Sequence, residues 1–390
     1  MSKYVAGRHF LQTPGPTNVP DRILRAMHRA PINHRGPEWG AVGLEVVVNL
    51  RKIFGTEGNV AIYPASGTGA WEAALLNTLS PGDKVLMSHT GWFAHLWVQM
   101  ARKLGLEPVL LETDWRRGAD VAAIEERLNA DKSHQIRAVC VVHNETSTSC
   151  MTHVLPVRAA MNRAAHPALL MVDAISSLAC SDFQHDAWGV DVTIAGSQKG
   201  LMVPPGLSFN AISAKALEAT KSAKLPRSYW DWEPLIAANS TGFFPYTPAE
   251  NLMFALNEGL KMLLEEGLPN VYARHERFAE ATRRAVRAWD MELQCQDAQS
   301  FSPGVTAIRT PDGHSADNLR NIILEKFNMA LGNGLGQIND KVFRIGHMGD
   351  LGELQLLGAL SGVEMGMRVA GMPHKSGGVQ TAMDYLAGNA

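Results

Sequence analysis

Between residues 60 and 210, short apolar runs alternate with stretches of helical periodicity, and this alternation constrains the fold more than any other feature of the chain. Strands that alternate with helices form a largely parallel sheet with helices on its faces. We therefore expect an α/β fold with a mostly parallel sheet. The expected strands are 59–63, 84–87, 137–142, 168–172 and 191–195, and the expected helices are 70–79, 95–104 and 157–165.

The sequence pattern changes near residue 250. Two long helices are expected at 251–266 and 271–289, and shorter strands and helices follow them. We place a domain boundary there, so that residues 20–250 form a large domain and residues 251–390 form a smaller α+β domain. The tail from Gly371 is rich in glycine and small residues, and we expect it to be loosely packed.

Composition and charge argue against several classes of partner. Of 390 residues, 46% are hydrophobic and 19% are charged, as in a soluble globular enzyme, and the net charge of -2 gives no reason to expect nucleic acid or an anionic membrane as a partner. No apolar run reaches the roughly 18 residues that would span a bilayer. The N-terminus lacks the apolar core of a signal peptide, so we expect a cytoplasmic location. The cysteines and histidines show no metal-ligand spacing, so we expect no metal.

A glycine-rich turn at 64–69, Pro-Ala-Ser-Gly-Thr-Gly, lies between an expected strand and an expected helix. Small residues let backbone N–H groups approach an anion, and the helix N-terminus adds a favourable dipole, which suits a phosphate. The turn matches neither GxxxxGK[ST] nor GxGxxG. A tight turn with a serine or threonine helix cap explains the segment equally well without a ligand.

Two charged residues follow successive expected strands. Asp173 ends an apolar run, where a carboxylate is costly unless it faces a cation such as a pyridinium nitrogen. Lys199 lies in a Gly-Ser-Gln-Lys-Gly loop, where shielding from water would favour the neutral amine that forms an imine. Taken singly, Asp173 could be a cap or turn residue and Lys199 a surface lysine. Their spacing can place a carboxylate and an amine at opposite ends of one flat ring.

Seven ordered motifs resemble the class V aminotransferases, which have the fold type I of pyridoxal-phosphate (PLP) enzymes. The likeness covers nearly the whole chain and is strongest to the serine–, alanine– and aspartate–glyoxylate aminotransferase group. It implies the PLP-transferase fold, a large PLP-binding domain, and an N-terminal segment 1–19 that packs near the active site. The motifs are TPGPTN at 13–18, SGTG at 66–69, HNET at 143–146, VD at 172–173, GSQK at 196–199, PPG at 204–206 and RIG at 344–346.

The resemblance implies PLP as the cofactor and assigns it the following contacts. Lys199 matches the lysine that holds the cofactor as a Schiff base, and Asp173 matches the partner of the pyridine nitrogen. Ser66, Gly67 and Thr68 match the phosphate-binding turn. The other expected cofactor contacts are Trp92, which is expected to stack on the ring face unless it is a core tryptophan, Thr146 near the ring oxygen, and Gln198.

Substrate contacts and a shared active site are also implied. Arg344 matches the arginine that grips the substrate α-carboxylate, although it could form a structural salt bridge, and Gly15 is expected beside the substrate. In such enzymes the neighbouring subunit also touches the phosphate, and the matching segment contains Tyr246 and Thr247, although the Tyr-His-x-Thr pattern of some relatives is absent. We therefore expect a homodimer or a higher oligomer. The expected substrates are a small amino acid (serine, aspartate or alanine) and glyoxylate or another 2-oxo acid; Arg35 could favour aspartate or be purely structural.

Other activities stay open to different degrees. A PLP-dependent lyase or kynureninase-like hydrolase is not excluded by any one residue. A cysteine desulfurase is disfavoured because residues 300–390 contain no cysteine to carry a persulfide. A Rossmann dehydrogenase would need GxGxxG after an early strand, which is not found. A non-catalytic PLP-binding protein would bind the cofactor without exchanging amino groups.

Overall fold

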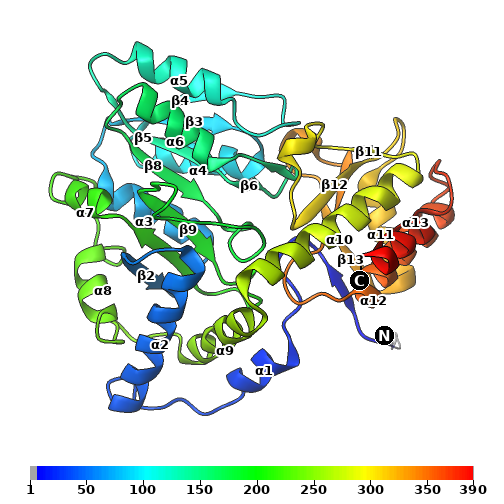
Figure 1. The fold of residues 1–390 in the computed structure, drawn as a ribbon, viewed down its shortest axis with the longest axis horizontal. Helices are drawn as coiled ribbons and strands as arrows, with labels where there is room; N and C mark the ends of the chain where they lie inside the picture. The colour runs from blue at the N-terminus through cyan, green and yellow to red at the C-terminus, as the bar shows by residue number, and fades with distance from the viewer. Residues whose placement is uncertain (1–6, 390) are drawn as a thin grey trace.

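The computed structural model describes residues 7–389, and a mostly parallel sheet forms the centre of its larger part (Figure 1). Within these residues, seven strands pair in the order β2-β10-β9-β8-β5-β3-β4. β10 is antiparallel to both its neighbours, and the other adjacent strands are parallel. The predicted α/β fold is confirmed. The strands are β2 (Asn59–Tyr63), β3 (Lys84–His89), β4 (Glu107–Glu112), β5 (Ile136–Val142), β8 (Leu169–Asp173), β9 (Val192–Gly196) and β10 (Ser208–Ile212).

Helices cover both faces of this sheet, so its central strands are buried on both sides. Along β8, Leu170 and Val172 belong to one hydrophobic cluster, whereas Leu169 and Met171 belong to the other. This alternation follows the two-residue period of a strand and explains why the run is apolar throughout. The helices of this part are α1 (Asp21–Met27), α2 (Pro37–Phe54), α3 (Gly67–Thr78), α4 (Trp92–Lys103), α5 (Val121–Ala130), α6 (Val154–Arg163), α7 (Ala214–Thr220), α8 (Trp232–Asn239) and α9 (Glu250–Glu266).

A second sheet lies at the other end of the molecule and has the order β1-β13-β14-β12-β11 (Figure 1). β1 (Phe10–Gln12) joins it in parallel with β13 (Met329–Asn333), so the start of the chain is attached to strands formed near its end. The remaining strands are β11 (Glu292–Leu293), β12 (Val305–Arg309) and β14 (Val342–Gly346), and a separate hairpin is formed by β6 (Asn144–Glu145) and β7 (Cys150–Met151). The helices are α10 (Leu268–Ala288), α11 (Ala316–Phe327), α12 (Glu353–Val369) and α13 (Gly378–Gly388), with 3-10 turns at Ala298–Ser300 and Gly336–Ile338.

The C-terminal tail differs from its prediction as a loose segment. It forms α13, which packs against α10 and α12. Gly378 lies so close to Trp289 that a Cβ added there would be 2.3 Å from the indole Nε1, and this nitrogen donates a hydrogen bond to Glu364 (2.7 Å). Small residues at this point therefore permit a tight helix contact, with Ala382 and Leu386 buried in the core.

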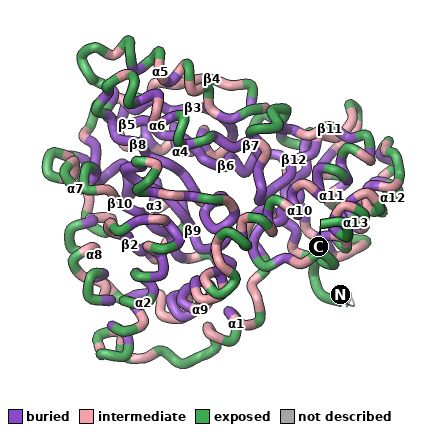
Figure 2. The backbone as a smooth tube through the Cα atoms, viewed as in Figure 1, coloured by how far each residue is buried: buried purple, intermediate pink, exposed green. Residues whose placement is uncertain are grey.

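Burial is concentrated in the two sheets and the segments between them (Figure 2). The division of the chain near residue 250 stays a prediction; α9, which follows it, packs against α1 and α2. No helix within residues 7–389 is long and apolar enough to cross a membrane. The expected cytoplasmic location also stays a prediction.

Candidate active site

A cavity of about 280 Å³ opens where several strands of the large sheet end. Asp173 is the last residue of β8, and Lys199 lies in the turn that follows β9. Ser66, Gly67 and Thr68, which follow β2, line the same cavity. Because the carboxyl ends of parallel strands meet at one edge of a sheet, residues distant in sequence converge there, as in other open α/β folds.

The amine of Lys199 is buried beneath the N-terminal segment. Its Nζ donates a hydrogen bond to the carbonyl of Pro14. Gly15 lies directly above it, because a Cβ at this position would be 2.5 Å from Nζ. Burial lowers the pKa of Lys199 to about 8, and the positive charge of Arg344 contributes in the same direction. A lysine of this kind is neutral far more often than a surface lysine and can act as a nucleophile or base.

The carboxyl group of Asp173 is buried, and each of its oxygens accepts a hydrogen bond. The backbone N–H of Ile175 donates to Oδ1 (2.7 Å), and the indole Nε1 of Trp71 donates to Oδ2 (3.0 Å). Burial raises the pKa of Asp173 to about 7, whereas the two donors and Lys199 lower it. A cationic ligand atom facing this carboxyl group would favour its ionised form.

The glycine-rich turn forms the N-terminus of α3, with Ser66 as the N-cap residue. The Ser66 side chain makes no capping hydrogen bond to the described backbone, so its hydroxyl is available to a ligand. Gly67 packs so closely against Ile175 that a Cβ would be 2.3 Å from Cδ1. The arrangement leaves the first N–H groups of a 12-residue helix pointing at the cavity, which suits an anion such as a phosphate.

Two further polar side chains face the cavity. The hydroxyl of Thr146 is hydrogen-bonded to that of Ser176. The Oε1 atom of Gln198 is buried without a hydrogen-bond partner among the described residues. Because an unsatisfied buried acceptor is costly, Gln198 is well suited to receive a hydrogen bond from a bound ligand.

Arg344 reaches the edge of this site from β14. Its Nη1 donates to the carbonyl of Thr146 (2.9 Å) and its Nε to that of Asn333 (2.8 Å), so two backbone acceptors fix the guanidinium plane. Burial lowers the pKa of Arg344 to about 10, which leaves it positively charged at neutral pH. Arg344 does not itself line the cavity, but its charge acts on Lys199, which does.

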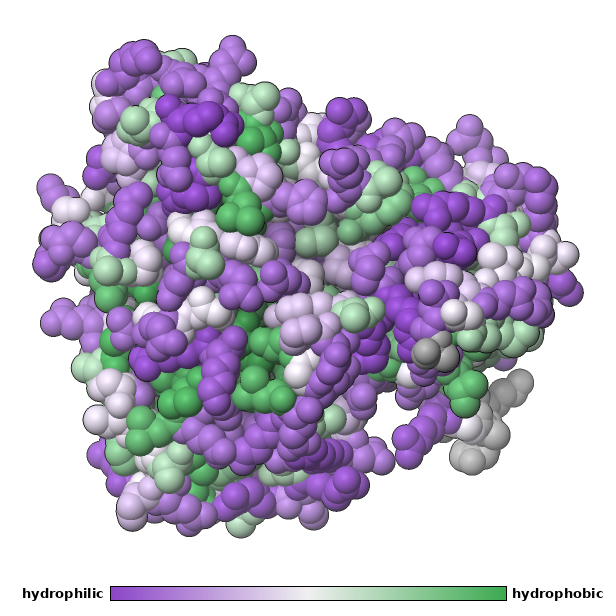
Figure 3. Space-filling view, in the orientation of Figure 1, coloured by the Kyte–Doolittle hydropathy of each residue, from purple (hydrophilic) through white to green (hydrophobic). Residues whose placement is uncertain are grey.

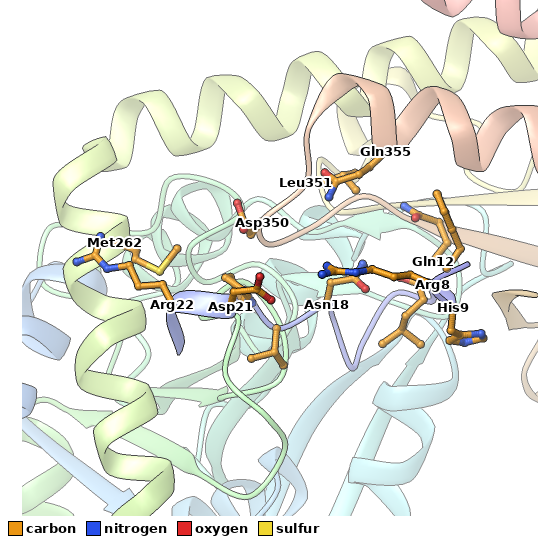
Figure 4. A pocket seen from close by; sticks show the side chains of 14 residues that line it. Arg8, His9, Gln12, Asn18, Asp21, Arg22, Met262, Asp350, Leu351 and Gln355 are labelled. Atoms are coloured by element: carbon orange, nitrogen blue, oxygen red, sulfur yellow. The ribbon is translucent and has the colours of Figure 1, made fainter. Parts of the chain in front are cut away.

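A larger cavity of about 600 Å³ borders the N-terminal segment (Figure 4). Gln12 and Asn18 line this larger cavity, whereas Gly15 and Pro16 between them line the smaller one. Its charged side chains are exposed or paired, as Arg22 is with Glu265 (2.5 Å). It therefore lacks the buried amine and carboxyl group that give the smaller cavity its chemistry.

Comparison with known proteins now decides the family. The profile of the family described as aminotransferase class-V matches residues 9–336, which is most of the chain. The chain belongs to this family. It is 48% identical to a serine–glyoxylate aminotransferase of Methylorubrum extorquens (98% of this chain, 97% of the relative) and 42% identical to an L-aspartate–glyoxylate aminotransferase of Paracoccus denitrificans (95% and 94%). Its fold matches a crystal structure of pyridoxamine-pyruvate aminotransferase from Mesorhizobium loti with a TM-score of 0.92, at 26% identity over 99% and 98% of the chains.

The aromatic side chains of Phe93 and Trp71 line the cavity of this aminotransferase, whereas Trp92, for which a cofactor contact was expected, does not line it. α4 begins at Trp92, and neighbouring side chains on a helix point in different directions. Trp92 turns away from the cavity and stacks on His95, with ring centroids 5.2 Å apart and an angle of 21° between the planes. Gly336 also packs against the indole of Trp92, since a Cβ at position 336 would be 2.6 Å from it.

Three other predicted residues do not reach the cavity within the same chain. Arg35 is exposed, and its backbone N–H is bound to the side chain of Asn33 (3.1 Å). Tyr246 stacks on Tyr229, with centroids 4.7 Å apart, and Thr247 is exposed. Their predicted roles stay predictions.

Sequence reasoning missed Trp71, Phe93 and Ser176, all of which line the cavity of the aminotransferase. Trp71 lies four residues after Gly67 on α3, so helical spacing could have placed it on the same face as the glycine-rich turn. Ser176 follows Asp173 closely enough to be suspected. No sequence signal separates Phe93 from Trp92, since both are aromatic and adjacent.

Proposed function

We propose that this aminotransferase binds pyridoxal phosphate and transfers the amino group of a small amino acid to glyoxylate or a similar 2-oxo acid. One observation carries the proposal: the buried Lys199 amine and the buried Asp173 carboxyl group face one cavity at the N-terminus of α3. The relatives named for serine–glyoxylate and L-aspartate–glyoxylate transfer, each similar over nearly its whole length, support this substrate class.

The residues present fit this cofactor. We assign its phosphate to Ser66, Gly67 and Thr68, where helix N–H groups and hydroxyls offer donors to an anion. We assign its ring nitrogen to Asp173, its ring face to Phe93 in place of Trp92, and its polar ring substituents to Thr146 and Gln198, the latter with its unsatisfied Oε1. When bound, pyridoxal phosphate supplies an aldehyde carbon for the donor's amino group and a ring that accepts electrons from the donor's Cα.

Lys199 has two roles in this proposal. Its neutral Nζ holds the cofactor before the donor arrives, and burial makes that neutral form accessible near pH 8. With the donor bound beside it, the same Nζ would be placed to take the proton from the donor's Cα as a general base and to give it back as a general acid. Pro14 and Gly15 lie over Nζ and exclude water from it, which keeps the amine desolvated.

Arg344 is proposed to bind the α-carboxylate shared by the donor and the 2-oxo acid. We expect Arg344→Lys to raise the KM for donor and acceptor by about 10- to 100-fold, because a lysine loses the planar pair of N–H donors to a carboxylate. Steady-state kinetics with both substrates varied would measure this. Arg368→Lys, an exposed position on α12, is the matched control. If Arg344 were purely structural, Arg344→Lys would change the stability of the protein and leave both KM values unchanged in the folded variant.

The donor panel tests the proposed activity itself. Purified protein supplied with pyridoxal phosphate is mixed with glyoxylate and, in turn, serine, aspartate and alanine, and glycine formation is measured. We expect at least one of these donors to give stoichiometric glycine and the matching 2-oxo acid. Absence of amino-group exchange with every donor, in protein that holds the cofactor, would remove the proposal in favour of a hydrolase or lyase.

We further propose a homodimer in which each subunit completes the other's site. Leu44 and Val48, one turn apart on α2, are 42% and 48% exposed, and Figure 3 shows hydrophobic surface where Figure 1 places α2 and α9. Phe243 packs on this helix, since a Cβ at Gly40 would be 2.9 Å from its ring. Tyr246 and Thr247 follow Phe243, and Arg35 precedes α2, so all three would lie close to such an interface.

The dimer is tested by charging this apolar face. We expect wild-type protein to have a dimeric mass in light scattering, and the double variant Leu44→Glu, Val48→Glu to be monomeric and inactive, because two carboxylates would have to be buried without partners. Leu354→Glu on α12, where Leu354 is 84% exposed, is the matched control and should stay dimeric. Full activity in monomeric protein would contradict a shared site.

A further inference from the structure

We propose that Trp71 is a positioning residue that fixes both the orientation and the charge of the Asp173 carboxylate, so that this group can hold a protonated ring nitrogen. The inference rests on the proposed function, because it assigns that ring to the cavity beside Asp173. It names a residue whose own ring need not touch the reacting atoms.

The geometry that carries the inference is a hydrogen bond between two buried groups. The Trp71 side chain is 1% exposed, and its Nε1 donates to Asp173 Oδ2 at 3.0 Å. The N–H of Ile175 holds the other oxygen, Oδ1, at 2.7 Å. A carboxylate with one donor on each oxygen cannot rotate freely about its Cβ–Cγ bond. The lone pairs that remain on the two oxygens therefore keep a fixed direction toward the cavity.

Trp71 is itself held rigidly. Its ring stacks on that of Trp97 from α4, with centroids 5.8 Å apart and an angle of 11° between the planes. It stands one helical turn after Gly67 on α3. The helix that presents its N-terminus to the proposed phosphate therefore also orients the carboxylate assigned to the opposite end of the cofactor. A shift of α3 would move both contacts together.

The hydrogen bond also controls the charge of Asp173. Burial, with a smaller contribution from the charge of Glu145, raises the pKa of this carboxyl group to about 7, although Ile175, Trp71 and Lys199 lower it. Removing the Trp71 donor would raise the pKa again, so that more of the carboxyl group would be protonated at neutral pH. A neutral carboxylic acid attracts a cationic ring nitrogen less than a carboxylate does. Cofactor binding should therefore weaken most at acidic pH.

A matched pair of variants separates this role from packing. Trp71→Phe removes the N–H that reaches Asp173. Trp97→Phe removes the other indole of the same stack, whose Nε1 is buried without a hydrogen-bond partner in the described part of the chain. Both variants lose one buried indole ring and keep an aromatic side chain. The hydrogen bond to the carboxylate is lost in Trp71→Phe alone.

The experiment is a titration of cofactor-free protein with pyridoxal phosphate, followed by absorbance over a range of pH. For Trp71→Phe we expect the Kd at neutral pH to rise by about 10- to 100-fold, as for loss of a hydrogen bond to a charged group. We also expect the low-pH side of the plot of binding against pH, here called the acid limb, to shift to higher pH by about one unit. Trp97→Phe should change the Kd by less than about threefold and leave the acid limb in place.

A second comparison uses Asp173→Asn, which removes the titrating carboxyl group. In that background, Trp71→Phe should leave the acid limb where it is, because no carboxylate remains to titrate. Equal losses in Trp71→Phe and Trp97→Phe, or a loss that is the same at every pH, would overturn the role of Trp71 while leaving the proposed function intact. Wild-type protein that takes up no pyridoxal phosphate would instead overturn the proposed function.

Discussion

Lys199→Ala is expected to abolish amino-group transfer, with kcat falling by about 10⁴-fold, the upper range for loss of a general acid–base group. The variant also loses the amine that we propose binds the cofactor covalently, so the absorbance band of that covalent link should be absent from the loaded protein. Glycine formation from glyoxylate and the best donor, together with the visible spectrum, would measure both effects.

The stability of Lys199→Ala shows whether its loss of activity comes from the missing amine or from unfolding. Burial lowers the pKa of Lys199 to about 8, below its ordinary value near 10.4, so the unfolded chain binds this proton more tightly. Between these pH values folding releases the proton, and at neutral pH the buried lysine therefore lowers the free energy of unfolding of the cofactor-free chain. We expect cofactor-free Lys199→Ala to be at least as stable as wild type. Lys221→Ala, at an exposed lysine paired with Glu218 (2.6 Å), should keep full activity. Retention of transfer and of the absorbance in Lys199→Ala would remove the assignment.

Asp173→Asn is expected to lower kcat by about 10²- to 10³-fold, comparable to removing one electrostatic contact from a transition state. The amide cannot carry the negative charge that keeps a facing ring nitrogen protonated. It also has a single acceptor oxygen, so it can satisfy Trp71 or the N–H of Ile175 but not both. Pre-steady-state measurement of the donor half-reaction would isolate this effect from product release.

The control for Asp173→Asn is Asp312→Asn, at an exposed aspartate, which should leave the rate unchanged. The wild-type rate should also decline as the pH falls through the pKa of Asp173 in the loaded protein, because protonation removes the same charge. A wild-type donor half-reaction with the same rate as that of Asp173→Asn would show that the carboxylate does not support the chemistry.

The sequence predicted five of the seven strands of the central sheet, because those five are buried, and missed β10 and the more exposed edge strand β4. Buried strands are continuous apolar runs, and 59–63 matches β2 at both ends. The starts of α3 and α4 were placed three residues too late, since Gly67 and Gly91 resemble loop residues although one begins a helix and the other caps one. The C-terminal helix was missed for a related reason: its glycine serves a close contact with Trp289, which local composition does not reveal.

The candidate site was predictable in its polar groups and less so in its aromatic ones. Asp173 ends one apolar strand and Lys199 follows another, and parallel topology brings strand ends together. The direction of a side chain at a helix start depends on tertiary packing, so Phe93 rather than Trp92 at the cavity could not be foreseen. The hydrogen bond from Trp71 likewise joins two groups far apart in sequence and has no local signature.

Reductive trapping tests the central claim most directly. Protein loaded with pyridoxal phosphate is treated with borohydride, digested and mapped by mass spectrometry to find the residue that carries the cofactor. Our account predicts one modified peptide, with the cofactor on the side chain of Lys199, and none when a donor that is active in the panel is added in excess before reduction. Cofactor fixed to another lysine, or a chain with no modified lysine at all, would contradict it.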